Sequence, residues 1–380
     1  MMDKLNTTIH PGSALLLAAL ALPGLEAQAD SIPDVSQISV DYLHYQDSQP
    51  GLDRIGVHSP AVHLLTPIAG QWLLEAGLVS DHVSGASPRY HTAISGASHM
   101  ADTRLGSDVR LTRYLDNATI SLGAAHSGEN DYHSRAWSLA GSLTTEDHNT
   151  TGNLSFGESS DTIDPVNGLV VNEKRHTAQF LIGVEQVLTQ RDIVKLDFTH
   201  SRGRGYFSDP YKYVDNRPRE RDSNSLLARW NHHAADGDWV VRSSYRYYRD
   251  SFGIHAHTLG EEFEQPLAKG WSVTPSVRLY SQSAAVFYFD PVYDPNFGPP
   301  FPVGYNFTSN AYTSADQRLS AFGAVTLGLK VEKQLGQGWS VHTKFERYRQ
   351  QGRWRLFGDG SPGLARFDAS IWQLGLTKQW

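Results

Sequence analysis

The sequence predicts an all-β fold, an antiparallel up-and-down transmembrane β-barrel of about sixteen strands, within a range of about fourteen to eighteen. Three observations lead to this prediction. Apolar and polar side chains alternate with a period of two from end to end, the connections between these segments are alternately short and long, and tryptophans follow the short connections. Charged residues make up only 19% of the chain and the net charge is −7, which excludes a charged helical bundle and a basic nucleic-acid-binding protein.

The first 29 residues predict a cleaved signal peptide. Lys4 supplies a weakly positive start, residues 14–22 form an apolar run, and Ala27-Gln28-Ala29 offers a cleavage site of small residues. We therefore expect residues 30–380 to form a single barrel domain outside the inner membrane. The chain contains no cysteine, which fits export and excludes a cysteine nucleophile and a thiolate metal site.

Period-two alternation is clearest in residues 271–280. Trp271, Val273, Val277 and Leu279 share one face, and serine, threonine and Arg278 occupy the other. A soluble β-sandwich or propeller would also alternate, but its outer face would be polar. The expected strands lie near residues 36–45, 57–64, 71–81, 104–113, 118–126, 133–143, 150–157, 177–185, 192–200, 223–232, 238–248, 252–263, 271–280, 319–332, 339–346 and 368–380.

The connections predict which end of the barrel faces the periplasm. Short connections fall near residues 65–70, 114–117, 144–149, 188–191, 233–237, 264–270 and 334–337. Longer ones fall near 46–56, 82–103, 127–132, 158–175, 201–222, 281–318 and 348–367, and the connection at 249–251 is a short exception. Short periplasmic turns, long outer loops and an even strand number are typical of outer-membrane barrels.

Aromatic residues mark the expected membrane boundaries. Trp72, Trp239, Trp271 and Trp339 each follow a short connection, which predicts a periplasmic girdle because indole rings prefer the membrane interface. Tyr245 and Tyr247, or Tyr280, are candidates for the opposite girdle. On the last strand Trp372, Leu374, Leu376 and Trp380 share one face, and this resembles the C-terminal insertion signal that the barrel-assembly machinery reads. Two departures are the terminal Trp in place of Phe, and Lys378.

Two segments resemble motifs of a bacterial family known as the domain of unknown function numbered 3570. They are Val79 to Pro88 (VSDHVSGASP) and Asp215 to Arg219 (DNRPR), and they occur in the family's order after an early strand at 40–45. The resemblance covers essentially all of the mature chain and implies an outer-membrane barrel with no established activity. The resemblance also implies gene neighbours that encode a periplasmic flavin transferase and a thioredoxin-like protein, and with them an envelope redox setting.

The polar faces of the strands predict a charged lumen. A basic stripe, expected from four consecutive strands, is the main candidate site because it would favour anions or dock an acidic partner; it comprises Arg229, Arg242, Arg246 and Arg278. The other expected lumen charges are Arg104, Asp108, Arg110, Lys195, Asp197, Lys330, Glu332, Lys344 and Glu346. The alternative is a solvated wall whose charges only keep the lumen wet.

Other chemistry receives little support. His255 and His257 share a strand face and are weak candidates for a transition metal, but no third ligand can be assigned, so we expect no metal and no cofactor. The chain lacks a Gly-x-Ser-x-Gly elbow, a His-Glu-x-x-His motif and a phosphate-binding glycine loop, so we expect no enzyme. The aromatic, proline-rich 281–318 connection is expected to fold into the lumen, to bind a partner or to pack over the mouth.

Two functions fit this architecture. The first is a pore or transport-type channel, because sixteen strands normally enclose an aqueous lumen. The second is a non-conducting scaffold or sheath that holds a periplasmic or surface protein, perhaps of a redox system. In both cases the expected surroundings are the lipid bilayer of the cell outer membrane, with no nucleic-acid partner.

Overall fold

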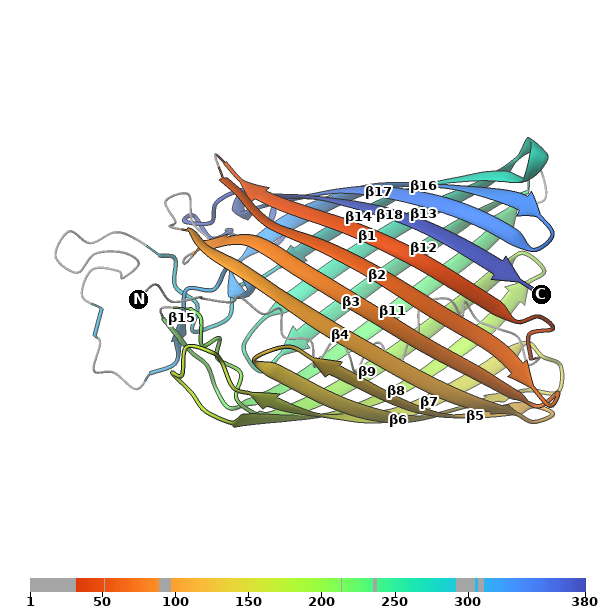
Figure 1. Cartoon of the computed structure of the whole chain (residues 1–380), viewed down its shortest axis with the longest axis horizontal. Helices are drawn as coiled ribbons and strands as arrows, with labels where there is room; N and C mark the ends of the chain where they lie inside the picture. The colour runs from red at the N-terminus through yellow and green to blue at the C-terminus, as the bar shows by residue number, and fades with distance from the viewer. Residues whose placement is uncertain are drawn as a thin grey trace.

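The computed structural model describes residues 32–50, 52–88, 97–212, 214–234, 238–291, 305–306 and 311–380. In this part of the chain sixteen strands form one closed barrel (Figure 1). The first eight are β1 (Gln37–Gln49), β2 (Leu52–Ile68), β3 (Trp72–Pro88), β4 (Ala97–Tyr114), β5 (Ala118–Gly128), β6 (Tyr132–Thr144), β7 (Thr150–Ile163) and β8 (Glu173–Thr189). The others are β9 (Asp192–Gly205), β11 (Glu220–Ala234), β12 (Trp239–Asp250), β13 (His255–Leu267), β14 (Trp271–Gln282), β16 (Phe322–Gly336), β17 (Trp339–Gln351) and β18 (Phe367–Gln379).

The strands pair antiparallel in chain order, and β1 closes the barrel against β18. A separate two-stranded sheet, β10 (Asp215–Asn216) with β15 (Thr313–Ser314), lies in the connections, as do the 3-10 turns η1 (Ala268–Gly270), η2 (Gln317–Leu319) and η3 (Gly352–Trp354). No helix among the described residues is long and apolar enough to cross a membrane. The predicted all-β barrel of about sixteen antiparallel strands is confirmed.

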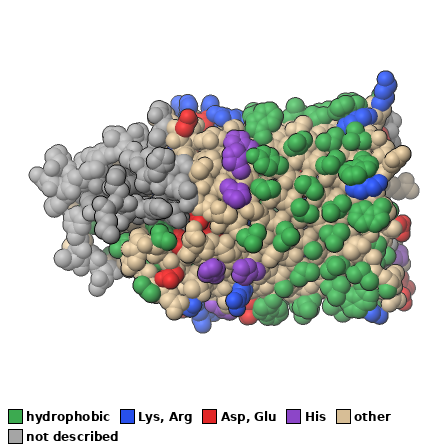
Figure 2. All heavy atoms as spheres, viewed as in Figure 1, with side chains coloured by type: hydrophobic (Ala, Val, Ile, Leu, Met, Phe, Trp, Pro, Cys, Tyr) green, Lys and Arg blue, Asp and Glu red, His purple; other side chains and the backbone are tan. Residues whose placement is uncertain are grey.

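The outer wall of the barrel is apolar and the inner wall is polar. Leu78, Leu122 and Leu327 are 58%, 61% and 59% exposed, although leucine is normally buried in water-soluble proteins. Figure 2 shows hydrophobic side chains covering the part of the wall nearer the C-terminus, with histidines at the border of this belt. Closure leaves no unpaired strand edge in lipid, and the apolar side chains face outward because lipid solvates them better than polar ones.

Seven short connections lie at one end of the barrel, here called the inner end, together with the C-terminus (Figure 1). The β16–β17 turn shows why the sequence turns there. Gly338 has φ +76°, and a Cβ at this position would collide with the backbone oxygen of Gln379. Because only glycine fits, Gly338 ends the turn immediately before Trp339 begins β17.

The strands extend further at the other, outer end than the sequence predicts. The expected long connection at 46–56 is wrong, because β1 continues to Gln49 and β2 already begins at Leu52. One strand is shorter at this end than the sequence predicts. The strand expected from residue 319 begins at Phe322, because Leu319 belongs to η2. Beyond the lipid both strand faces can be polar, so the alternation fades while the backbone ladder continues, as in the pair Asp161 and Arg175.

Candidate functional site in the lumen and at its outer mouth

The four arginines of the expected stripe lie on three strands, not on four consecutive ones. Arg229 is on β11, Arg242 and Arg246 are on β12, and Arg278 is on β14, so the earlier assignment is corrected. The register sets Arg229 opposite Ser244, Ser244 opposite Gly260, and Gly260 opposite Arg278. Arg229 and Arg278 therefore lie in one row of register partners on the inner wall, three strand spacings or about 14 Å apart.

Carboxylates interrupt this stripe. Arg242 Nη2 lies 2.8 Å from Glu264 Oε2 on β13, and Glu262 stands directly opposite Arg242 in the register. A cavity of about 360 Å³ opens along this wall, and its lining includes Lys195, Arg229, Arg242, Glu262, Arg278 and Glu346. The wall thus presents alternating charge and not a purely positive ladder.

The other expected lumen charges also stand beside partners of opposite sign. Arg104 Nε donates to Asp81 Oδ2 at 2.6 Å, Lys330 pairs with Glu332 at 2.7 Å, and Lys344 pairs with Glu346 at 3.2 Å. Asp108 and Arg110 are on β4 near Glu75, and Asp197 is on β9 near Lys195 and Arg229. These mixed pairs leave the lumen polar with little net charge.

The four tryptophans of the expected inner girdle each begin a strand at the inner end. Basic side chains lie over three of the rings, with Arg113 5.0 Å from Trp72, Lys333 5.3 Å from Trp271 and Lys378 5.4 Å from Trp339. This is the arrangement of an interface where an indole meets a cation that snorkels toward water.

Lys378, which is unusual for an insertion signal, belongs to this girdle. Besides covering the Trp339 ring, its Nζ donates a hydrogen bond to the backbone oxygen of Gln337. Trp372, Leu374 and Leu376 of β18 are 53%, 56% and 42% exposed on the outer wall, and Trp380, directly after the strand, is 59% exposed. Recognition by the barrel-assembly machinery stays a prediction.

Tyrosine and histidine share the outer border of the belt. Tyr247 and Tyr245 lie on the outer wall, and their hydroxyls meet Nδ1 of His255 at 2.9 Å and of His257 at 2.7 Å. Tyr280 instead lies on the lumen side of β14, where its hydroxyl donates to Gln282, so it is excluded from an outer girdle. The described residues bring no third His, Asp or Glu to His255 and His257 that would make a metal site.

The connections at the outer end fold into a packed unit. We call it the outer closure and define it as residues 206–212, 214–219, 251–254, 283–291 and 311–321. Its apolar centre is Phe252, Ile254, Ala285 and Leu319, all less than 5% exposed, with Phe207 and Phe287 against them. The barrel wall contributes Arg221, whose guanidinium lies 4.8 Å above the Phe252 ring. Residues 283–291 and 311–318 of the 281–318 connection therefore pack at the mouth.

A buried ion network joins two distant parts of the outer closure. Arg217 Nε donates to Asp215 at 2.9 Å, and Arg217 Nη2 donates to Asp316 Oδ2 at 2.7 Å. Arg318 Nη2 reaches Asp209 at 2.7 Å and its Nε reaches Asp316 at 2.7 Å. Burial alone would raise the pKa of Asp316, but Arg318 and Arg217 outweigh burial and hold this pKa well below its ordinary value.

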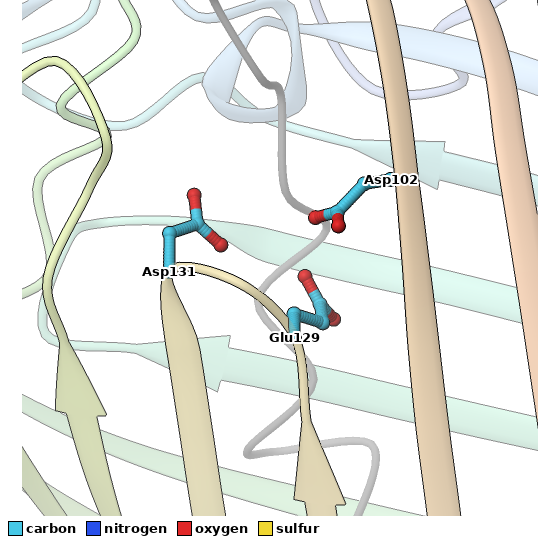
Figure 3. A group of neighbouring side chains, drawn as sticks. All are labelled: Asp102, Glu129 and Asp131. Atoms are coloured by element: carbon cyan, nitrogen blue, oxygen red, sulfur yellow. The ribbon is translucent and has the colours of Figure 1, made fainter.

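Three carboxylates gather beside the outer closure, those of Asp102, Glu129 and Asp131 (Figure 3). One oxygen of each lies within 4.8 Å of the others, a spacing that oxygen ligands of a hard cation can adopt. Burial, followed by the charges of Asp131 and Asp102, raises the pKa of Glu129 to about 8. Asp131 also accepts a hydrogen bond from the Tyr211 hydroxyl, which ties this group to the outer closure.

The DNRPR segment thus supplies Asp215 and Arg217 to the buried ion network. A comparison with models of protein families assigns the whole chain. The model of the family described as "Protein of unknown function (DUF3570)" matches residues 12–174 and 169–371. The chain belongs to this family. The other DUF3570 motif quoted above, VSDHVSGASP, covers the outer half of β3, and its part from Gly85 onward has no described side chains.

Solved structures resemble this DUF3570 barrel in fold. A "Bacterial polysaccharide outer membrane secretin" is 10% identical over 92% of this chain and 100% of its own, with a TM-score of 0.51. The siderophore receptor PirA from Pseudomonas aeruginosa is 11% identical over 90% of this chain and 61% of its own, with a TM-score of 0.46. A Pseudomonas aeruginosa FadL homologue is 11% identical over 90% of each chain, with a TM-score of 0.43. No curated protein matches the DUF3570 chain in sequence.

Sequence reasoning missed two parts of the DUF3570 site. Glu262 and Glu264 belong to the lumen wall, and their alternation along β13 was the signal that could have placed them there. The partners of Arg217 lie up to 99 residues away in the chain, at Asp316, and no local pattern predicts that contact.

Proposed function

We propose that this protein is an outer-membrane channel for small polar or charged solutes, with an outer mouth that the outer closure holds shut. The observation that carries the proposal is the partial exposure of the charged side chains in the lumen. Lys330, Glu332 and Lys344 remain 39%, 26% and 28% exposed in the barrel interior. A scaffold would gain by filling its interior with apolar side chains, whereas a solute path needs solvated ones.

The apolar outer wall supports the location. A closed barrel with an apolar outside and a polar inside is stable only in lipid, and bacterial barrels of this type occupy the outer membrane. The signal peptide expected at residues 1–29 would direct such export, but it lies outside the described residues. Passage of small solutes agrees with the mixed charge of the wall, which favours neither ion sign strongly.

Conductance of the purified full-length protein in planar bilayers tests the proposal. We expect brief, rare openings for the wild type and an open probability about tenfold higher or more for Asp316→Asn, since this change leaves Arg217 and Arg318 without their shared carboxylate. Asp359→Asn, at an exposed position in the β17–β18 connection, is the matched control and should behave as wild type. Silence of all three proteins in bilayers, with folding verified by heat-modifiable gel mobility, contradicts a channel.

The packed outer closure favours a second function, a scaffold that holds a periplasmic or surface protein. Asp209 and Asp316 are 1% and 0% exposed, which is the burial of a permanent core. The redox setting implied by the family would then concern the partner held. Crosslinking in native membranes, affinity purification and mass spectrometry test this function. A silent barrel that retains one stoichiometric partner favours the scaffold, and a conducting barrel that retains none excludes it.

A further inference from the structure

Three arginines surround one aspartate on the outer wall, near the outer end. Nη2 of Arg347, Nε of Arg349 and Nε of Arg366 lie 3.4, 2.7 and 2.7 Å from the oxygens of Asp368. The Asp368 side chain is 3% exposed, whereas those of the arginines are 43–48% exposed. One buried carboxylate thus positions three accessible guanidinium groups. We call these four residues the arginine cluster, and its net charge is +2.

The arginine cluster lies at the outer border of the apolar belt. Phe345, Arg347 and Arg349 share the lipid-facing side of β17 with Trp339 of the inner girdle. Trp339 and Arg349 are ten residues apart, or about 33 Å along the strand and about 25 Å across the bilayer at the usual tilt. Because an apolar band is about 25 Å tall, Arg349 reaches the level of the lipid headgroups, and the long side chain of Arg347, two residues below, can extend its guanidinium toward the same level.

Aromatic rings lie directly below these arginines. Phe345 and Trp372 are opposite each other in the register, with ring centroids 4.5 Å apart, and the next pairs toward the outer end are Arg347 with Ser370 and Arg349 with Asp368. The order along the wall is therefore apolar side chains, aromatic rings and then guanidinium groups. A lipid presents the matching order of acyl chain, glycerol or sugar, and phosphate.

Another set of arginines on the outer wall shows that this positive charge is local. Arg202 and Arg204 lie near the outer end of β9, 3.6–3.9 Å from Glu220 and Asp222 on β11. Two arginines there face two carboxylates, so that set is neutral. The arginine cluster has three arginines for one carboxylate, and each arginine gives Asp368 only one of its nitrogens.

We propose that the arginine cluster binds the phosphate groups of a phosphorylated glycolipid in the outer leaflet. A guanidinium group has five N–H donors in a planar fork that fits two phosphate oxygens, and each arginine keeps most of its donors after contacting Asp368. The cluster opens sideways to the membrane and has aromatic rings below it, so the ligand is a lipid headgroup and not a free phosphate ion. The proposal depends on the outer-membrane location given above and is independent of conduction.

Binding of rough lipopolysaccharide, whose lipid A moiety carries two phosphates, to the full-length protein in detergent tests the proposal. Native mass spectrometry or thermophoresis gives the affinity. Arg347→Gln/Arg366→Gln should weaken binding about tenfold, because two of three phosphate-facing guanidinium groups are lost while the Arg349–Asp368 pair is kept. The matched control, Arg202→Gln/Arg204→Gln, should stay within about twofold of wild type. Heat-modifiable gel mobility verifies folding, and Arg347→Gln alone, which removes the longest contact to Asp368, replaces the double variant if that one does not fold.

Two further ligands identify the source of the phosphate. Dephosphorylated lipopolysaccharide should bind the wild type as weakly as the double variant binds the phosphorylated form, and excess inorganic phosphate should not displace the glycolipid. Equal losses in the two double variants, unchanged binding after dephosphorylation, or displacement by inorganic phosphate would each overturn the proposal. Because the assay measures no current, its failure is distinct from failure of the channel.

Discussion

The outer closure and the lumen wall use the same kind of ion pair in different surroundings. In the outer closure the Arg217 and Asp316 side chains are 6% and 0% exposed, whereas Lys330 and Glu332 in the lumen are 39% and 26% exposed. Removing one partner of a buried pair costs about 3–5 kcal/mol, and an exposed pair contributes about 0.2–1 kcal/mol. The difference indicates that charges at the mouth hold loops together, while charges in the lumen remain accessible to solvent.

The largest effect expected from this comparison concerns Asp316. Asp316→Asn should destabilise the outer closure by about 3–5 kcal/mol, because Arg217, whose side chain is 6% exposed, keeps its charge in a buried site. Hydrogen exchange of residues 206–212 and 214–219 measures this directly, and exchange in the barrel strands should stay slow. Glu332→Gln, the same type of change in the lumen, is the control and should cost less than about 1 kcal/mol. Similar exchange in the two variants would remove the distinction between the regions.

A smaller effect is expected from pH at the carboxylates beside the outer closure. The folded mouth raises the pKa of Glu129 from 4.5 to about 8, so it binds this proton more tightly than an opened mouth does. The resulting stabilisation is full below pH 4.5 and is lost as the pH rises through about 8. Exchange near Tyr211, corrected for intrinsic rates, should accelerate over this range, and Glu129→Gln should flatten the profile. If the wild-type exchange rate near Tyr211 does not change with pH, Glu129 is solvated and its pKa is not raised.

The smallest effect on stability is expected in the lumen. Arg242→Gln/Arg246→Gln should fold and insert as wild type, since the Arg242 and Glu264 side chains are 25% and 33% exposed. Because the wild-type wall has mixed charge, the loss of two positive charges should shift the selectivity toward cations, measured as a reversal potential under a salt gradient. Arg242→Lys/Arg246→Lys is the matched control and should keep the wild-type preference. A glutamine variant that fails to insert would show that the lumen arginines are structural, as those of the outer closure are.

The sequence predicts the barrel well because the rule that forms it is local. A strand between lipid and water must alternate, so residues 271–280 reveal their two faces without knowledge of any neighbour. The same rule places Arg229, Arg242, Arg246 and Arg278 on the inner wall, but it cannot give the register that brings Glu262 and Glu264 beside Arg242. Such pairs depend on how neighbouring strands slide past each other.

The outer closure is beyond this kind of reasoning. Its segments show no period-two alternation, because they pack among other loops on all sides and do not separate lipid from water. Asp215 and Arg217 stand out in sequence as a family motif, but their meaning depends on Asp316, which the fold brings from another connection. A motif in a loop can thus mark a structural contact as readily as a binding site.

The tight outer hairpins have a consequence for a cell that carries this barrel. β1 ends at Gln49 and β2 begins at Leu52, and β5 and β6 are joined by residues 129–131 only. Proteases bind an extended stretch of loose chain, and a paired hairpin cannot supply one without unzipping. In the described part of the chain these hairpins should therefore survive protease treatment of intact cells, and a reporter epitope would be displayed better in a longer connection.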